Sequence, residues 1–473
     1  MACLDLCGIQ SYESALLRES ISAFGGTVSE KFDLMIKNGQ VMTPGGLVQT
    51  DIGVTNGKII TIGSLSNDSA QETYDATGLH ILPGVIDSQV HFREPGLEHK
   101  EDIAHGTKAA IKGGVTSIFE MPNTSPLTLD EQTLTAKLER AEQTAWCDYA
   151  FFMGGNSENA QRLAELERLP GCAGVKIFMG SSTGTLLAKD DEVIADVLAN
   201  GVRRVSVHAE DEDRLISRQN IAVEAEDPEA HPDWRDVESA VRATTRLVNL
   251  ARKANRRVHV LHISSRDEMD ILAKHKDLIS VEVTLNHLTL SAPDCYERLG
   301  AFAQMNPPVR DLDHQMGLWN AIQNGVVDVI GSDHAPHTIE EKERPYPSSP
   351  SGMPGVQTSL PLLLNHMHEG RLSLERIVDL TSAGPQRLFG IMGKGRIAVG
   401  YDADLVLVDL KKQRVISDEW IASKCGWTPF DGMSVMGWPV ATILRGNIVV
   451  REDEILGGPM GDAVRFFETS ASN

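Results

Sequence analysis

Residues 82–91 have the sequence LPGVIDSQVH, in which a short apolar run ends in polar side chains. Similar short apolar, β-branched runs recur after it, separated by stretches with helical character. These runs are Val115 to Glu120, Tyr149 to Met153, Gly174 to Met179, Arg204 to His208, Val258 to Ile263, Ile279 to Thr284 and Val326 to Ile330. Eight such runs, each followed by room for a helix, are typical of a (β/α)8 barrel.

Two β-rich segments flank this central region. Asn38-Gly39 and Asn56-Gly57 separate β-rich runs on its amino-terminal side, and Arg445-Gly446 lies between two such runs near the other end. Asn-Gly between β-rich runs is a strong hairpin signal. The sequence therefore predicts an α/β protein with a TIM-like barrel over residues 83–390 and a small β-sandwich domain built from both chain ends, residues 31–82 plus 391–455. Residues 1–30 are then an extension of unknown role, and residues 456–473 a tail.

Composition restricts the partners and the compartment. The chain of 473 residues has 44 Lys and Arg against 66 Asp and Glu, a net charge of −22, and so acidic a surface repels nucleic acid and anionic membranes. Its six cysteines form no CxxC pair, as in proteins of a reducing compartment. Residues 1–30 contain no apolar stretch of secretory length. We expect a cytoplasmic protein with neither nucleic-acid nor membrane partners.

Five of the predicted strands place a potential metal ligand at or near their carboxyl ends, where the active sites of barrels collect. These residues are His91, Lys176, His208, His262 and Asp333. A single His near a strand end is more often structural than a ligand. A lysine within an apolar run is harder to explain, because burying an uncompensated ammonium is expensive.

A metal site accounts for the whole set. Imidazole and carboxylate suit Zn²⁺ and similar ions. A neutral lysine can add carbon dioxide to form a carbamate, whose two oxygens can bridge two metals. Two such ions would activate a water and polarise a carbonyl, so that an amide could be hydrolysed near neutral pH.

The residues resemble the amidohydrolase superfamily and, within it, the dihydroorotases of the long barrel-plus-sheet type. The resemblance rests on PGVID at 83–87, HFREPG at 91–96, MPNT at 121–124, GVK at 174–176, HAED at 208–211, HIS at 262–264, MNPP at 305–308 and SDHAPH at 332–337. These words occur in family order over most of the chain. The resemblance implies reversible conversion of L-dihydroorotate and water to N-carbamoyl-L-aspartate, a step of pyrimidine biosynthesis.

The resemblance also implies a role for each matched metal-site residue. Lys176 would be the carboxylated bridge between two zinc ions, if two are bound. His208 and His262 would complete the more exposed ion, and His91 and Asp333 would hold the more buried one. Asp333 would also carry the proton between the attacking water and the ring nitrogen, first as general base and then as general acid.

A second set of residues indicates which substrate the resemblance implies. By resemblance, Arg93, Asn123 and His337 would hold the substrate carboxylate, and Asn306 would contact the ring. An Arg fork with further donors suits a planar carboxylate. Hydantoinases and allantoinases share the metal site but act on rings without that carboxylate, so this set favours dihydroorotate over their substrates. Each residue alone has another explanation: Arg93 could pair with a nearby acid, Asn123 could cap a turn, and His337 could lie on the surface.

The chain departs from the family pattern at Gln89, where relatives have the first His of an HxH motif, and at Asn286. A neutral amide oxygen is a weaker zinc ligand than imidazole. Three outcomes stay open: a two-metal enzyme with a looser buried site, an enzyme with only the metal of Lys176, His208 and His262, or a catalytically silent homologue that serves as a structural partner of aspartate transcarbamoylase. We favour an active enzyme, because the other ligands are present. A homodimer is expected from the resemblance.

Overall fold

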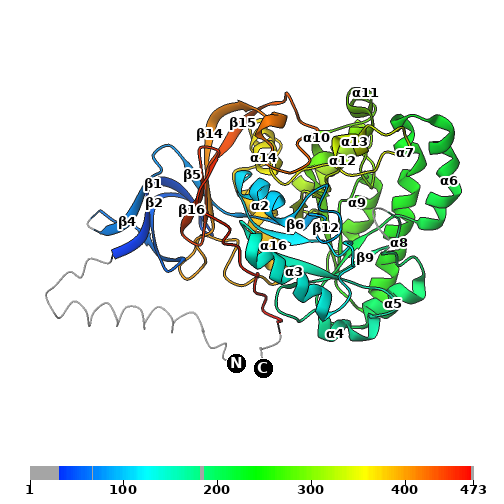
Figure 1. The fold of residues 1–473 in the computed structure, drawn as a ribbon, viewed down its shortest axis with the longest axis horizontal. Helices are drawn as coiled ribbons and strands as arrows, with labels where there is room; N and C mark the ends of the chain where they lie inside the picture. The colour runs from blue at the N-terminus through cyan, green and yellow to red at the C-terminus, as the bar shows by residue number, and fades with distance from the viewer. Residues whose placement is uncertain (1–30, 67, 182–185, 470–473) are drawn as a thin grey trace, which may run out of the picture.

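The computed structural model describes residues 31–66, 68–181 and 186–469. Figure 1 shows a barrel surrounded by helices beside a smaller sheet that combines strands from the beginning and the end of the described chain. Within these residues, no helix has both the length and the apolar composition that a membrane crossing requires.

An eight-stranded parallel sheet forms the barrel. Its strands follow one another in chain order: β6 (Val85–Val90), β7 (Val115–Glu120), β8 (Asp148–Gly154), β9 (Cys172–Phe178), β10 (Val205–His208), β11 (Val258–Val260), β12 (Ile279–Thr284) and β13 (Val329–Gly331). A parallel bridge between Val90 and His334 closes the barrel, and there the His91 N–H donates to His334 O at 2.7 Å. Every predicted run overlaps one of these strands, and the predicted barrel is confirmed.

Helices cover the outside of the barrel (Figure 1). They are α2 (Ile103–Lys112), α3 (Glu131–Thr144), α4 (Leu163–Leu166), α5 (Asp191–Ala199), α6 (Glu212–Ala225), α7 (His231–Trp234), α8 (Val237–Ala254), α9 (Arg266–Leu272), α10 (Leu285–Thr289), α11 (Asp294–Leu299), α12 (Leu312–Gln323), α13 (Ile339–Lys342), α14 (Ser359–His368), α15 (Leu374–Val378) and α16 (Gly384–Phe389).

Helix α8 shows why the sequence forms helices where it does. The Asp236 carboxylate caps its first turn by accepting a backbone hydrogen bond, and Asn255 ends it in the left-handed conformation at φ 49°, both common helix boundaries. Between them, Ala243, Leu247 and Ala251 are buried at helical spacing, so one face packs on the barrel.

The smaller sheet joins both chain ends, as predicted. It contains β1 (Lys31–Thr43), β2 (Gly46–Thr55), β3 (Lys58–Gly63), β4 (Ser69–Asp75), β5 (His80–Pro83), β14 (Leu405–Val415), β15 (Ser434–Leu444), β16 (Asn447–Arg451) and β17 (Glu454–Ile455). Among the described residues these strands form one continuous nine-stranded sheet, in which β5 pairs with β14. Its own apolar core combines residues from both ends, including Ile36, Ile52, Leu405 and Ile443.

Turn prediction was right at two positions and wrong at one. Asn56-Gly57 connects β2 to β3, and Arg445-Gly446 connects β15 to β16. Asn38-Gly39 lies inside β1, at a register shift against β2. Asn38 adopts the left-handed conformation there, φ 65°. A β-bulge and a hairpin turn both need a residue with positive φ, so the same residue types occur in both.

Candidate active site

A small polar pocket of about 20 Å³ opens at the carboxyl ends of the barrel strands. It is lined by Gln89, His91, Arg93, Phe178, His208, His262, Asn306, Asp333, Ala335, Ser351 and Gly352. A larger hollow of about 440 Å³ adjoins it, since both are lined by Asn306 and Ser351. Most of the residues predicted for the site are therefore brought together, although they are spread over some 240 positions of the sequence.

Two imidazoles face each other on one side of this pocket. His208 is the last residue of β10, and its Nδ1 lies 3.0 Å from Nε2 of His262, just beyond β11. Both rings are buried, and burial lowers both pKa values, that of His262 to well below its ordinary range. The rings are therefore neutral at pH 7 and able to donate lone pairs to a metal.

A buried acid stands behind this pair. Oε2 of Glu210 lies 3.0 Å from Nε2 of His208, and Glu210 is itself paired with the Arg235 guanidinium. Although burial alone would raise the pKa of Glu210, Arg235 holds it well below its usual range. A carboxylate at Nε2 favours the proton on that nitrogen and leaves Nδ1, which faces His262, unprotonated, as in many metal-binding histidines.

Lys176 lies one layer deeper, on β9, where it is paired in register with Ser206 of β10. Its side chain is fully buried, and Nζ has no hydrogen-bond partner among the described residues. Nζ lies 4.2 Å from the centre of the Phe178 ring. Burial lowers the pKa of Lys176 to about 7, against the opposing charges of Asp333 and Glu282. A substantial fraction of this lysine is thus a neutral amine at pH 7.

Asp333 forms the opposite side of the pocket. Its Oδ1 accepts a hydrogen bond from Nε2 of Gln89 at 3.0 Å and lies 3.2 Å from Nε2 of His91. The other ring nitrogen of His91 lies 2.8 Å from Oδ1 of Asn123. Gln89 therefore faces the site, and its Oε1 is buried without a partner in the described part of the chain.

Three pocket residues have unusual backbone conformations. Arg93, His262 and Asp333 have φ values of 66°, 38° and 48°. Side chains other than glycine rarely adopt this region, and such strain concentrates at functional sites. The left-handed backbone at His262 also explains why β11 ends at Val260. The sequence had placed His262 on this strand.

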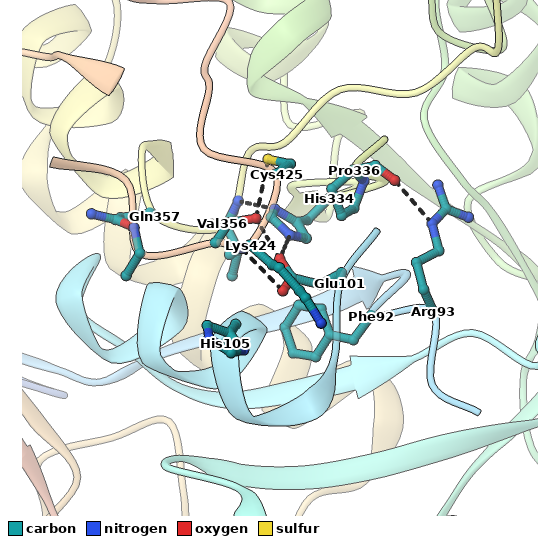
Figure 2. Close-up of polar contacts among 12 residues, drawn as sticks. Phe92, Arg93, Glu101, His105, His334, Pro336, Val356, Gln357, Lys424 and Cys425 are labelled. Carbon is teal, nitrogen blue, oxygen red and sulfur yellow. Dashed lines mark hydrogen bonds and ion pairs between the residues drawn. The ribbon is translucent and has the colours of Figure 1, made fainter. Parts of the chain in front are cut away.

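The Arg93 guanidinium is buried, and the described acids that act on its charge, Glu120 and Asp333 foremost, do so from beyond ion-pair distance. Nε donates to the Pro336 carbonyl at 3.2 Å, as Figure 2 shows, and Nη2 lies 3.3 Å from Nε2 of His337. No carboxylate of the described residues lies within ion-pairing distance of Arg93. The nearby acids Glu94 and Glu98 pair with Arg140 instead. A buried charge of this kind calls for an anionic partner.

His337 and Asn306 stand close to this guanidinium and to the pocket. His337 is fully buried rather than on the surface, and burial lowers its pKa to about 3. Asn306 Oδ1 lies 3.0 Å from Nε2 of His231. Sequence reasoning missed His231, together with Glu210 and Arg235. Only Glu210 carries a local signal, since it lies two residues after His208 in the word HAED.

The donor set fits a divalent metal. Two neutral imidazoles converge at 3.0 Å, and a partnerless buried amine lies beneath the same pocket. Asp333 and His91 offer a second pair at 3.2 Å. These are nitrogen and oxygen donors of the kinds that zinc prefers.

A separate cluster contains Glu101, Asp102 and His105. Asp102 caps helix α2 by accepting from the His105 N–H at 2.8 Å and also contacts that ring. Helix capping accounts for Asp102 and His105, and none of the three residues lines the pocket.

Comparison with known proteins agrees with this geometry. The model of the amidohydrolase family matches residues 80–449. The curated relatives include a dihydroorotase of Pyrococcus abyssi, 38% identical over 431 residues, which are 90% of this chain and 97% of the relative. Another is a dihydroorotase of Methanosarcina acetivorans, 35% identical over 442 residues, 90% of this chain and 94% of the relative.

Solved structures with the same fold include an L-hydantoinase (dihydropyrimidinase) from Arthrobacter aurescens. Its TM-score is 0.86 at 32% identity, covering 92% of this chain and 99% of that one. A dihydropyrimidinase from Brevibacillus agri has a TM-score of 0.85 at 31% identity, covering 93% and 99%. The family model and these relatives confirm the resemblance found in the sequence: the chain belongs to the amidohydrolase family, as a relative of the dihydroorotases.

Proposed function

We propose that this enzyme hydrolyses L-dihydroorotate reversibly to N-carbamoyl-L-aspartate, as a step of pyrimidine biosynthesis. The observation that carries the proposal is the buried Arg93 guanidinium, which has no counter-ion among the described residues and lies beside His337 at the pocket. Dihydroorotate brings a planar carboxylate that such a fork binds through two hydrogen bonds. The substrate carboxylate would therefore be the anionic partner of Arg93.

Lys176, His208 and His262 would hold a metal, with His91 and Asp333 for a second one. In this proposal Lys176 Nζ adds carbon dioxide and releases a proton, so that a carbamate replaces the neutral amine. When bound, a divalent ion lowers the pKa of a coordinated water and polarises a carbonyl. The donor set supports zinc, with one or two ions.

The remaining steps belong to the chain's own groups. Arg93, with His337 and Asn123, would orient the ring through its carboxylate, and Asn306 would contact the ring. A carboxylate oxygen of Asp333 would accept a proton from the attacking water and then deliver it to the ring nitrogen as the C–N bond breaks. Gln89 and His91 hold that carboxylate in place.

A second candidate is hydrolysis of an uncharged cyclic ureide, which the solved hydantoinase structures favour. These proteins share the fold with this chain at 32% and 27% sequence identity. Arg93 separates the two candidates, because a ring without a carboxylate leaves its charge unpaired. A catalytically silent partner of aspartate transcarbamoylase is the third candidate, and measurable turnover would exclude it.

The test compares dihydroorotate with dihydrouracil, the same ring without the carboxylate, for the wild type and for Arg93→Ala. Loss of two charge-assisted hydrogen bonds, at about 1.5 kcal/mol or more each, lowers kcat/KM for dihydroorotate by about 100-fold or more. Activity on dihydrouracil should change little. Arg140→Ala, which removes an exposed guanidinium that pairs with Glu94, is the matched control. Equal losses on both substrates, or no turnover by zinc- and bicarbonate-treated wild type, would contradict the proposal.

We also propose a homodimer, association with aspartate transcarbamoylase, and a cytoplasmic location. The first two are supported by the resemblance and are tested by light scattering of the protein alone and mixed with that transcarbamoylase. Free, buried thiols at Cys147, Cys172, Cys295 and Cys425 support a reducing compartment.

A further inference from the structure

A segment that connects two strands of the smaller sheet, β14 and β15, reaches the mouth of the barrel. Residues 421–428, here called the strap, follow the turn Asp418–Trp420 and precede β15 of the smaller sheet. The strap lies against the loop of residues 333–337, here called the catalytic loop, which carries both Asp333 and His337. The contacts occur near the two ends of this loop.

The first connection runs from the strap through Glu101 to His334. Nδ1 of this buried ring accepts hydrogen bonds from the Gly355 and Val356 N–H groups at 3.1 and 3.4 Å. The proton of the neutral ring must therefore be on Nε2, which lies 3.3 Å from Oε2 of Glu101. Figure 2 shows His334 between Val356 and the Glu101 carboxylate. The ring is thus fixed in one tautomer and one orientation.

The strap completes the Glu101 end of this contact. Ser423 Oγ donates to Glu101 Oε2, and the Lys424 N–H donates to Oε1 at 3.2 Å. Glu101 and His334 are 0% and 1% exposed, so neither has water as an alternative partner. The strap therefore helps to orient His334, the residue next to Asp333, by holding Glu101, which also accepts a hydrogen bond from the Asp102 N–H.

The second contact is made through Trp427. Its indole Nε1–H donates to the His337 carbonyl at 2.8 Å. The indole is 3% exposed and packs edge-on against Phe302, with ring centres 4.9 Å apart. Trp427 therefore holds the backbone of the residue whose side chain lies beside the Arg93 guanidinium.

The strap thus fixes the catalytic loop at both ends. Asp333 is in a sparsely populated conformation, φ 48°, which persists only where the surroundings hold it. Between the ends, the Pro336 carbonyl accepts from Arg93. A small displacement of this loop would move the proton-transferring carboxylate at one end and the substrate-carboxylate site at the other.

We propose that Ser423 and Trp427 of the strap, together with Glu101, are positioning residues of the active site. Glu101 and Ser423 orient Asp333 through His334, and Trp427 sets the substrate-carboxylate site through His337. The inference rests on the proposed function. It predicts that the two ends of the strap affect different kinetic parameters, which a purely structural role would not do.

Trp427→Phe tests the carboxylate end, because it retains an aromatic ring and removes only the N–H donor. Loss of one buried hydrogen bond should raise KM and Kd for dihydroorotate about five- to tenfold with little change in kcat. Kinetics on dihydrouracil should stay at the wild-type level. Trp420→Phe is the matched control, since that indole lies just before the strap and donates to Asp453, away from the pocket.

Glu101→Gln tests the Asp333 end. Both Glu101 oxygens accept hydrogen bonds, Oε2 from the His334 side and Oε1 from the Lys424 and Asp102 N–H groups. The Gln amide therefore presents a donor to donors in either orientation, and it should lower kcat about tenfold on both substrates with little change in KM. Ser423→Ala should give a smaller loss in the same direction, and it replaces Glu101→Gln if that variant does not fold.

Binding by calorimetry and steady-state kinetics on both substrates separate the outcomes. The inference would be overturned if Trp427→Phe lowered activity equally on both substrates, or if Trp420→Phe had the same effect on KM as Trp427→Phe. It would also be overturned if the variants lowered only Tm and left the kinetics unchanged. Failure of the proposed function appears in the wild type itself, as no binding or turnover of dihydroorotate. Failure of the positioning role appears only in the comparison of variants.

Discussion

Replacing Lys176 with Met should stabilise the metal-free protein while abolishing its activity. The Lys176 amine is fully buried and has no hydrogen-bond partner among the described residues. Met has a similar length and no polar atom, so it removes the cost of burying the amine. The same change removes the group that would carry the carbamate.

The size of the effect follows from the pKa. Burial lowers the pKa of Lys176 from 10.5 to about 7, and each unit corresponds to about 1.4 kcal/mol. At pH 7 the folded protein therefore pays about 3–5 kcal/mol to keep this lysine buried. Lys176→Met should raise the free energy of unfolding by a comparable amount, less any difference in packing.

The sign of the pH dependence can also be derived. Between pH 7 and 10.5 the unfolded chain binds more protons at Lys176 than the folded chain, so the stability of the wild type rises with pH. The advantage of Lys176→Met is greatest at or below about pH 7 and shrinks towards pH 10. Urea denaturation of metal-free, bicarbonate-free protein at pH 7 and pH 9 measures this difference.

Lys137 provides the matched control. It is also fully buried, but Nζ donates to the Met121 carbonyl at 3.1 Å and lies 3.8 Å from Glu120. Burial also lowers the pKa of Lys137, to about 8, but Lys137→Met removes the partner of both Glu120 and the Met121 carbonyl, so it should stabilise the protein less than Lys176→Met does. A destabilised Lys176→Met, or a difference from wild type that does not change with pH, would refute the reasoning.

Three further predictions concern the metal centre and the ion-pair network of Lys394, which links Asp148 of the barrel with Asp404 beside the smaller sheet. Gln89→His places an imidazole beside Asp333 and should raise the affinity for a second ion; unchanged stoichiometry and affinity in a metal titration would mean that Gln89 does not contribute to that site. Glu210→Gln removes the charge behind His208 and should weaken metal binding about 10- to 100-fold in a chelator competition, whereas wild-type affinity would show that this carboxylate is unimportant. Lys394→Met removes the shared partner of three buried aspartates and leaves Asp404 without an ion pair among the described residues, since Arg445 and Lys58 still pair with Asp148 and Asp402. It should cost about 3–5 kcal/mol in urea denaturation; a loss below about 1 kcal/mol would indicate that this network is replaceable.

The sequence alone was sufficient to predict the barrel and to single out most of the candidate metal ligands. Apolar β-branched runs with helical stretches between them are a local, repeating signal, and parallel strands place their carboxyl ends on one side of a barrel. His208, at the end of β10, could therefore be placed near Asp333 without knowing any contact. The error at Asn38-Gly39 has the same local origin, because one backbone conformation serves both a hairpin turn and a bulge.

Tertiary structure decided how these side chains are held and charged. Glu210 stands behind His208, Gln89 donates to Asp333, and Arg93 lacks a counter-ion among the described residues. The strap lies about 90 positions after the loop it supports, yet Trp427 bonds to His337. Apart from the short separation of Glu210 and His208 in the chain, these contacts have no periodic or compositional trace in the sequence. Burial and hydrogen bonding between distant segments arise only when the chain has folded and excluded water from between them.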